Sequence, residues 1–355
     1  MNQTFLPYDF IELKKVDDSY SYKQKGDLSG VLHVTMTVKT PMFAVKEFGG
    51  INPNPRFIPG SSIKGMLRNA AEIVWNDHLT VLHDYHQKDD RIPDEWKKSE
   101  ISIQRHGLGS HLFGFTSDNT SQEKEGEPLT NAYGSALTFT NAQAVGNRNR
   151  FIQQFKRNYF SLMKPEGLSC KYYVVDNKKR AAGRKIYLAG TTKDVQSQLS
   201  IPQVPNELKD FVGTRFIKKT VQDQEVLIYP NSVFTFKVYF NQLTRQHLAD
   251  VIRLLELERG AFHALGKGKP LGFGRNSLKV DKIVTKNSED IFDLGKPVYS
   301  GTLSKEELLQ TEENSHEELL KEFIELSRPQ TFNRKKAYAT RTVKSLRYRL
   351  NKEKR

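Results

Sequence analysis

The sequence predicts an α+β fold, in which an antiparallel sheet carries its helices on one face. Two stretches of the chain have the order strand, helix, strand, and shorter strand patterns lie between them. In the first stretch, residues 32–38 alternate between apolar and polar side chains, as a half-buried strand does. The apolar side of this strand is formed by Leu32, Val34, Met36 and Val38.

A helix is expected after the long loop that follows this strand, because the run of glycines and prolines ends at Gly60. A serine hydroxyl can accept a hydrogen bond from a backbone N–H of the first helical turn, so Ser61 or Ser62 is expected to cap the helix. Apolar side chains then recur at helical spacing, at Ile63, Leu67, Ala70, Ala71 and Val74.

The second stretch begins with a strand whose apolar face is formed by Phe234, Phe236, Val238 and Phe240. Thr244 is expected to cap the next helix, and a glycine-rich loop then leads to the strand pattern of residues 276–284. The apolar stripe of this helix is Leu248, Val251, Ile252 and Leu255. Two such units, with further strands between them, are typical of a ferredoxin-like or RRM-like core.

Shorter strands are predicted between the two stretches. Residues 135–142 contain one, which carries Leu137 and Phe139. Residues 170–175 and 184–189 suggest two more, on either side of a basic turn. We expect these two to pair as a hairpin that projects from the body.

The chain is predicted to form one domain over residues 1–300, with an insertion at about residues 77–130, and a helical extension over residues 301–355. The extension is first acidic and then basic: residues 301–330 carry 3 basic and 8 acidic side chains, and residues 331–355 carry 10 basic and 1 acidic. A capping box from Ser315 to Glu318 is expected to start a helix with Leu319, Leu320, Phe323 and Ile324 inward, and a second helix is expected to carry Val343, Leu346 and Leu350.

The composition favours a polyanionic partner. The formal net charge is +14 over 355 residues, with a pI near 9.5, and nucleic acid is the first candidate for such a basic chain. Cys170 is the only cysteine, which excludes a disulfide framework and a cysteine-based zinc site. No segment is apolar enough for a membrane span or a signal peptide, so we expect a soluble protein in the reducing cytoplasm.

The glycine-rich loop reads GKGKPLGFGR from Gly266 to Arg275. It fails the dinucleotide-binding pattern, because Leu271 stands where that pattern needs glycine, and no Gly-Lys-Ser/Thr opens a helix. Its glycines allow a backbone or a base to come close, and its cations suit phosphates. The glycines are Gly266, Gly268, Gly272 and Gly274, and the cations are Lys267, Lys269 and Arg275. The alternative is a tight helix-to-strand connection with incidental charges.

The start of the first helix is the second candidate phosphate site. Its free amide groups attract anions, and Ser61 and Ser62 add hydroxyl groups. Lys64 and Arg68 lie four residues apart on one helical face, beside the open surface of Gly65. The alternative is an ordinary helix cap with a solvated basic face.

Both segments together closely resemble the RAMP superfamily of CRISPR-associated proteins. The helix start IPGSSIKGMLR and the glycine-rich loop ending in GFG are marks of that family. Further matches are FLPYDFIEL near the start, HLFG at residues 111–114 followed by SALTFTNA, and GRKIYLAG at residues 183–190. The matches occur in the expected order over roughly residues 5–285.

The resemblance implies an RRM-like backbone subunit of a type III CRISPR ribonucleoprotein effector, in which a hairpin thumb props the guide open at intervals. It places Ser61, Ser62, Lys64 and Arg68 on phosphates of the guide RNA (crRNA), and residues 266–275 along the same groove. The implied partners are the guide RNA, the paired target RNA and the other subunits of the effector. The protein would then recognise RNA shape and backbone, while base pairing reads the sequence.

A metal-dependent endonuclease of the same family, which cleaves target RNA or processes guide precursors, is an alternative, and so is a structural end-capping subunit. Family members that cleave RNA usually carry an aspartate in the loop after the first strand, and work with a divalent metal. Between Val38 and Ser61 this chain has no aspartate, and Glu47 is the only carboxylate. Glu47 and, more weakly, Asp27 are therefore the catalytic candidates, with Mg²⁺ or Mn²⁺ as the cofactor if the chain is a nuclease; no other cofactor is expected.

Histidines cluster after the first helix, at His78, His83 and His86 among aspartates. His83 and His86 are three residues apart and could share a helical face, which makes a metal or acid–base site conceivable. The spacing matches no tight metal-binding pattern, and solvated histidines of an insertion are the favoured interpretation. The basic C-terminal end is expected to bind RNA, dock on a neighbouring subunit or stay solvated.

Overall fold

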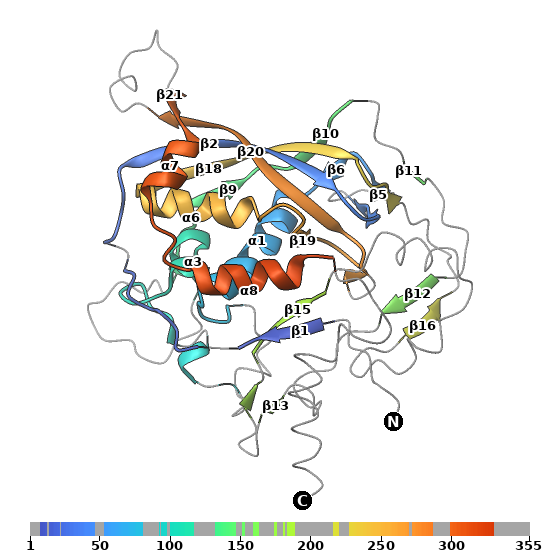
Figure 1. Ribbon diagram of the computed structural model, residues 1–355, viewed down its shortest axis with the longest axis horizontal. Coiled ribbons are helices and arrows are strands. Elements are labelled where there is room, and N and C mark those ends of the chain that lie inside the picture. Colours follow the sequence, from blue (N-terminus) through green and yellow to red (C-terminus); the bar gives the residue numbers. More distant parts are fainter. Residues whose placement is uncertain are drawn as a thin grey trace, which may run out of the picture.

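A central antiparallel sheet organises the molecule (Figure 1). The computed structural model describes residues 8–46, 53–80, 92–116, 132–146, 183–188, 227–269, 272–286 and 299–329, apart from positions 13, 22, 93, 98 and 99, together with short strands between residues 151 and 219. The long strands are β2 (Leu28–Val38), β18 (Val233–Leu243) and β20 (Arg275–Lys286), and the sheet order is β19-β20-β2-β18-β10-β6, with β9 also on β18 and β21 on β20.

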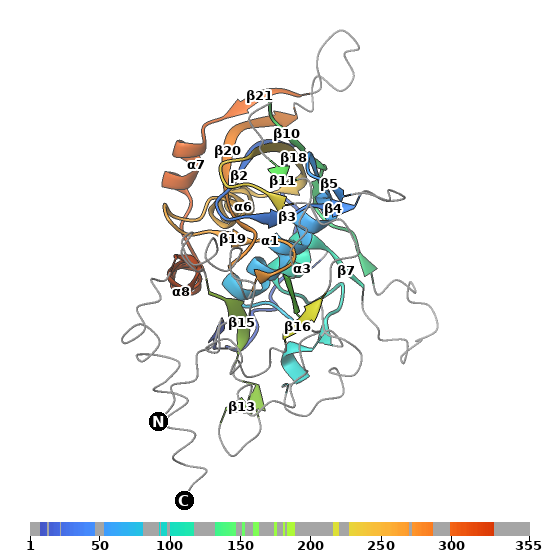
Figure 2. The same ribbon diagram turned by 90° about the vertical axis from the view of Figure 1, so that its right-hand side faces the viewer.

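This order confirms the predicted ferredoxin-like core. The first strand of each β-α-β unit, β2 and β18, lies in the middle, and the closing strands β20 and β9 (Leu137–Phe139) lie outside them. Helices α1 (Gly60–Val74) and α6 (Arg245–Leu255) cover one face of the sheet, as Figures 1 and 2 show from two sides. Val34 and Met36 of β2 are buried beneath them, while the alternate Thr35 stays accessible, as the alternation predicts.

The remaining elements are short. They are β1 (Tyr8–Ile11), β3 (Met42–Phe43), β4 (Val45–Lys46), β5 (Pro53–Asn54), β6 (Phe57–Ile58), a 3₁₀ turn at Asp94–Trp96, α3 (Leu108–Phe113), β7 (Phe115–Thr116), β8 (Ala132–Tyr133), β10 (Ala142–Ala144), β11 (Phe151–Ile152), β12 (Tyr159–Leu162), β13 (Val174–Val175), β14 (Arg180–Ala181), β15 (Arg184–Tyr187), β16 (Phe216–Lys219), β17 (Leu227–Ile228), β19 (His263–Ala264), β21 (Tyr299–Leu303), α7 (Lys305–Thr311) and α8 (Glu317–Ser327). None of the described helices is long and apolar enough to cross a membrane.

The capping predictions have mixed outcomes. Thr244 caps α6 by accepting from His247 N, as predicted. The serine cap of α1 is wrong, because Pro59 occupies the N-cap position and both serines lie inside the first turn. The first amide of α1, Gly60 N, instead donates to the Asn141 side chain at 2.9 Å. Since Asn141 follows β9 in the chain, this cap is made by the tertiary fold.

The C-terminal capping box is also wrong. Helix α8 begins at Glu317 with His316 at the N-cap and no side-chain cap. A short helix that the sequence did not predict, α7, precedes it and is capped by Ser304, which accepts from Glu307 N. The inward side of α8 is as predicted: Leu319, Leu320, Phe323 and Ile324 are all buried.

The segment predicted as an extension packs into the same core as the body. Strand β21 pairs with β20, and α8 packs against α1. Leu308 and Phe323 belong to the one large apolar cluster that also holds Leu32 and Phe234. The division of the chain into domains stays a prediction, and the helix expected around Val343 lies outside the described residues, as does much of the predicted insertion.

The predicted hairpin is wrong for its second strand. Strands β13 and β14 pair across the basic turn, but β15 pairs with β1 near the N-terminus, antiparallel from Tyr8↔Tyr187 to Ile11↔Arg184. Gly183 explains this turn away from β13: its φ is 144°, and a Cβ there would lie 2.1 Å from the Ile11 carbonyl oxygen. The glycine lets the chain pass close to β1, and together β1 and β15 lie below α1, on the side away from the sheet (Figures 1 and 2).

Candidate nucleic-acid interface

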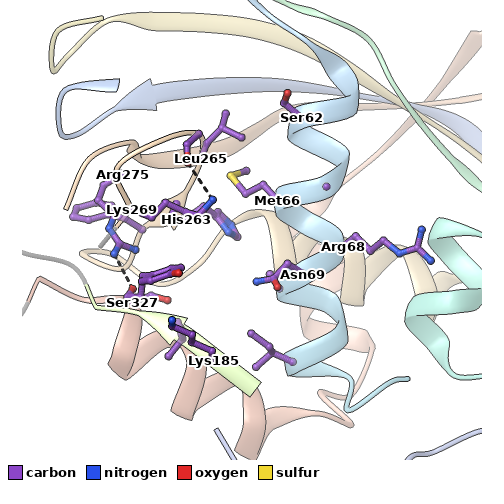
Figure 3. Close-up of a pocket in the computed structure, with 18 of the residues that line it drawn as sticks. Ser62, Met66, Arg68, Asn69, Lys185, His263, Leu265, Lys269, Arg275 and Ser327 are labelled. Atoms are coloured by element: carbon purple, nitrogen blue, oxygen red, sulfur yellow. Dashed lines mark hydrogen bonds between the residues drawn. The ribbon is translucent and has the colours of Figure 1, made fainter. Parts of the chain in front are cut away.

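A cavity of about 750 Å³ lies between α1, the glycine-rich loop and β15 (Figure 3). We call it the α1 cavity. Helix α1 contributes one face to it, through residues spaced three and four apart, as helical geometry requires. That face includes Ser62, Gly65, Met66, Asn69 and Ile73, and Arg68, Ala70 and Glu72 of α1 border the cavity beside it. The loop contributes Leu265, Gly266, Lys269 and Arg275, and β15 contributes Arg184, Lys185, Ile186 and Tyr187.

The two predicted phosphate-binding segments therefore border one cavity, although they are far apart in the sequence. Of the predicted residues, Ser62, Arg68, Gly266, Lys269 and Arg275 line it. Ser61 and Lys64 lie on the same helix start, and Lys267 lies on the same loop. Gly268, Gly272 and Gly274 shape the loop and do not border the cavity.

The start of α1 presents small and polar groups. Ser61 is exposed and Ser62 is half-buried, while burial, and then the charge of Arg68, lowers the pKa of Lys64. Gly65 is exposed, and a Cβ at this position would have no atom within 4 Å. The helix therefore offers an open surface beside its first turn, where a helix attracts anions.

The glycine-rich loop is held in place by its own backbone. Gly274 has a φ of 74°, and a Cβ there would lie 1.9 Å from the Leu265 carbonyl oxygen, so only glycine fits. Gly274 N donates to Pro41 O at 2.9 Å, and the Thr40 hydroxyl donates to Gly272 O at 2.8 Å. Gly266, with a φ of 84°, has open space where its side chain would be. The loop is thus rigid at its base and bare where it meets the cavity.

Two lysines of the loop lie at its accessible side. Lys269 Nζ donates to Gly266 O at 3.1 Å, and burial, and then the charge of Arg275, lowers its pKa. Lys267 is exposed, with Nζ 5.3 Å from the centre of the Phe43 ring. Both ammonium groups can turn towards an anion at the mouth of the cavity, because a lysine side chain is long and flexible.

Two of the predicted cations are engaged inside the protein. Arg68 donates to Gly114 O at 2.7 Å, and in Figure 3 its side chain points away from the other labelled residues. Arg275 is 2% exposed, and its Nη2 donates to Tyr187 O at 2.7 Å and to Leu188 O at 2.6 Å. The Arg275 bonds join two walls of the cavity, the loop end and β15, whereas the Arg68 bond joins α1 to the C-terminal end of α3.

Sequence reasoning did not single out several polar residues of the cavity, among them Asn69, Glu72 and Arg184. Glu72 lies between two arginines, with Oε1 3.6 Å from Arg68 Nε and Oε2 3.6 Å from Arg184 Nη1. Burial raises the pKa of Glu72 and lowers the pKa of Arg184 to about 10. Arg184 belongs to the motif GRKIYLAG, and Glu72 lies four residues after Arg68 on α1, the spacing of a helical ion pair. These were the available signals.

Of the catalytic and metal-binding candidates, the two that the structure describes, Asp27 and His78, do not line this cavity. Asp27 is exposed just before β2, and Glu47 lies outside the described residues. His78 is buried with its Nδ1 3.1 Å from Asp77 Oδ1, and His83 and His86 are also outside the described residues. In the part of the chain that the structure describes, no cluster of three or more histidine, cysteine or acidic residues could hold a metal ion.

The histidine of the HLFG motif, His111, is buried and packs in the interior of the fold. His106 Nε2 and His111 Nδ1 lie 3.1 Å apart in a buried aromatic cluster with Tyr20, Tyr133 and His247. Burial lowers the pKa of His111 to about 4. The histidines are therefore held in their neutral form.

These observations define an α+β protein of ferredoxin-like topology, with one cavity between its first helix and its glycine-rich loop. The model of the RAMP superfamily matches residues 35–278, which is more than half of the chain. The chain belongs to the RAMP superfamily, and so to the CRISPR-associated proteins.

Among solved structures, the chain is similar to Csc2 of Thermofilum pendens, with 11% sequence identity and a TM-score of 0.40. The likeness covers 88% of this chain and 80% of that one, and at this level we base no conclusion on it. A search of curated proteins found no match.

Proposed function

We propose that the chain is a guide-RNA-binding backbone subunit of a multisubunit type III CRISPR effector in antiviral defence. Its partners are the guide RNA, the paired target RNA and the other effector subunits, in the cytoplasm. Membership of the RAMP superfamily supports this function. The observation that carries it is the meeting of the α1 start and the glycine-rich loop at one cavity.

In this proposal, the α1 start and the loop hold the guide by its phosphates. Ser61 and Ser62 donate hydroxyl hydrogen bonds beside the positive end of the helix dipole, and Lys64 adds charge. Lys267 and Lys269 neutralise phosphates from the other side. Arg68 and Arg275 have structural parts in this proposal, because their guanidinium groups already donate to carbonyls of the protein.

Salt dependence of RNA binding tests this function. Purified full-length chain, freed of nucleic acid, is titrated with a labelled single-stranded RNA at several salt concentrations. Each lost phosphate contact reduces the slope of log K against log salt by about 0.7. We therefore expect a slope lower by about 1.4 for the double variant Lys267→Ala/Lys269→Ala.

Lys321→Ala is the matched control, because Lys321 is an exposed lysine on α8 whose partner is Glu317. It should leave the slope unchanged. Equal slopes for the wild type and the loop variant would contradict the proposal. Co-purification offers a second measurement: the wild type should retain RNA of defined length, and the loop variant should retain much less.

A nuclease function makes a different prediction. If the chain cut guide-paired RNA with Mg²⁺ or Mn²⁺, and Glu47→Ala abolished the cutting, the endonuclease alternative would replace the proposal. An end-capping subunit would instead keep its RNA binding in the loop variant. The described residues add no observation in favour of either alternative.

A further inference from the structure

Arg184 lines the α1 cavity with part of its guanidinium group unsatisfied. Its side chain is 5% exposed, and it stands at the start of β15. Nε and Nη2 are buried and have no hydrogen-bond partner among the described residues. These two atoms form one side of the guanidinium plane, so their N–H groups point in nearly the same direction.

An unsatisfied buried arginine is costly. Buried polar groups nearly always have hydrogen-bond partners, so two buried guanidinium nitrogens without one are an exception that requires an explanation. Arg184 cannot avoid this cost by losing its proton, since its pKa stays near 10 despite burial. A fold that retains such a group at a cavity is expected to use it for a ligand.

The neighbouring carboxylate does not satisfy Arg184. Glu72 Oε2 lies 3.6 Å from Arg184 Nη1, which is the third nitrogen and not one of the two unsatisfied atoms. Glu72 Oε1 already accepts from the Thr80 hydroxyl and lies 3.6 Å from Arg68 Nε. One carboxylate thus serves two arginines, and Asp77 adds a second negative charge whose field also reaches Arg184.

The ligand chemistry follows from the geometry of the guanidinium group. Two parallel N–H donors match two oxygens of a phosphate, which is the bidentate pairing that arginine favours over lysine. Asn69, on the exposed face of α1, adds an amide to the same cavity, and in Figure 3 it lies above Lys185 of β15. A volume of about 750 Å³ also gives room for a nucleotide unit behind the phosphate.

We propose that Arg184 forms a phosphate subsite in the α1 cavity, distinct from the α1 start and the glycine-rich loop. Its Nε and Nη2 donate to two oxygens of one phosphate group, and Asn69 borders the same space. From Ser62 to Glu72 the helix rises by roughly 15 Å, so a ligand that reached both ends would extend over several phosphates of a chain. The phosphate is either one of an RNA chain or that of a free nucleotide.

Thermal unfolding with three probes tests the subsite and its source. Full-length protein, freed of nucleic acid, is heated in inorganic phosphate, in AMP and in a short single-stranded RNA, each against chloride of equal ionic strength. A ligand that binds only the folded state raises the unfolding temperature. We expect a rise in the wild type. In Arg184→Gln we expect little or none with inorganic phosphate or AMP, and a smaller rise than in the wild type with RNA, which keeps its contacts to the glycine-rich loop. A rise with all three probes indicates a site open to free nucleotides, and a rise with RNA alone indicates a site for chain phosphates.

Three variants keep the test independent of folding. Arg184→Lys retains the positive charge but removes the two parallel N–H donors. Its affinity for the probe that stabilises the wild type should therefore fall at least about tenfold, which is the effect of one charge-assisted hydrogen bond. Asn69→Asp places a negative charge in the cavity without touching Arg184 and should also weaken binding. Arg105→Gln removes an exposed arginine that pairs with Asp18, and should bind as the wild type does.

Equal binding by the wild type, Arg184→Lys and Asn69→Asp would overturn the subsite. This failure is separate from failure of the proposed function. If the Arg184 variants bind RNA normally while Lys267→Ala/Lys269→Ala does not, the subsite is wrong and the guide-binding function stands. If the lysine variant binds normally and the Arg184 variants do not, the subsite stands without that function.

Discussion

Two buried arginines border the α1 cavity, and they differ in what their guanidinium groups contact. Arg275 donates from Nη2 to the carbonyls of Tyr187 and Leu188, and so joins β20 to β15. Arg184, on β15 itself, has two buried nitrogens without a hydrogen-bond partner among the described residues. Arg275 therefore stabilises the fold through its hydrogen bonds. In our proposal, the two unsatisfied nitrogens of Arg184 bind a phosphate group. Position at a cavity therefore does not tell which cations bind a ligand.

The largest expected effect is a difference in the free energy of unfolding between variants of the two arginines. Arg275→Gln removes the donor of two buried carbonyls, and should lower the free energy of unfolding by about 2–4 kcal/mol. Arg184→Gln removes two buried donors that have no partner among the described residues, together with one 3.6 Å ion pair to Glu72, so we expect a smaller loss than for Arg275→Gln in the absence of phosphate. Urea unfolding of both variants measures this. Equal losses would show that Arg184 is as structural as Arg275.

A second test examines the loop that Arg275 anchors. Gly274→Ala should destabilise the protein by about 2 kcal/mol or more, because its φ is 74° and the new methyl would lie 1.9 Å from Leu265 O. Gly266→Ala shares the positive φ but meets open space, so only the backbone cost of about 1 kcal/mol is expected. Urea midpoints compare the two, and equal losses would mean that the Leu265 contact adds nothing.

A third test measures how stability depends on pH, because two buried histidines, His111 and His263, are expected to stay neutral in the folded protein. Burial lowers the pKa values of His111 and His263 to about 4 each, from 6.5. The unfolded chain binds protons first as the pH falls, so the stability these groups contribute is complete above about pH 6.5 and is lost progressively towards pH 4. We expect a loss on the order of 2 kcal/mol per histidine at pH 5. His111→Gln should flatten this dependence, and an unchanged profile would contradict the assignment.

The smallest expected effect concerns the open side of α1. Gly65→Ala places a methyl group where a Cβ has no atom within 4 Å, and should stabilise the helix by about 0.5–1 kcal/mol. Gly65→Leu should fold equally well but obstruct the cavity and weaken RNA binding. Calorimetry and RNA titration on the same samples separate the two effects. If Gly65→Leu binds RNA as tightly as the wild type does, the RNA does not bind at this face of α1.

The core elements were predictable because their signals are local. The alternation of β2 and β18 and the helical spacing of α1 and α6 each depend on neighbouring residues, and the structure buries the predicted faces. Thr244 as a cap of α6 is equally local, since it accepts from an amide three residues later. The lysines and serines of the two phosphate-binding segments could also be recognised from their sequence motifs, and their RNA contacts stay a prediction.

Only the tertiary structure decided the contacts between segments that are far apart in the sequence. Asn141 caps α1, β15 pairs with β1, and Arg68 and Arg275 donate to carbonyls far along the chain. A sequence shows that a residue is cationic, but only the packed chain decides whether its donors meet a carbonyl, a carboxylate or a cavity. For that reason the sequence by itself determined the sheet, its helices and the basic composition of the chain. Only the packed fold decided that Arg184 keeps Nε and Nη2 without a hydrogen-bond partner among the described residues.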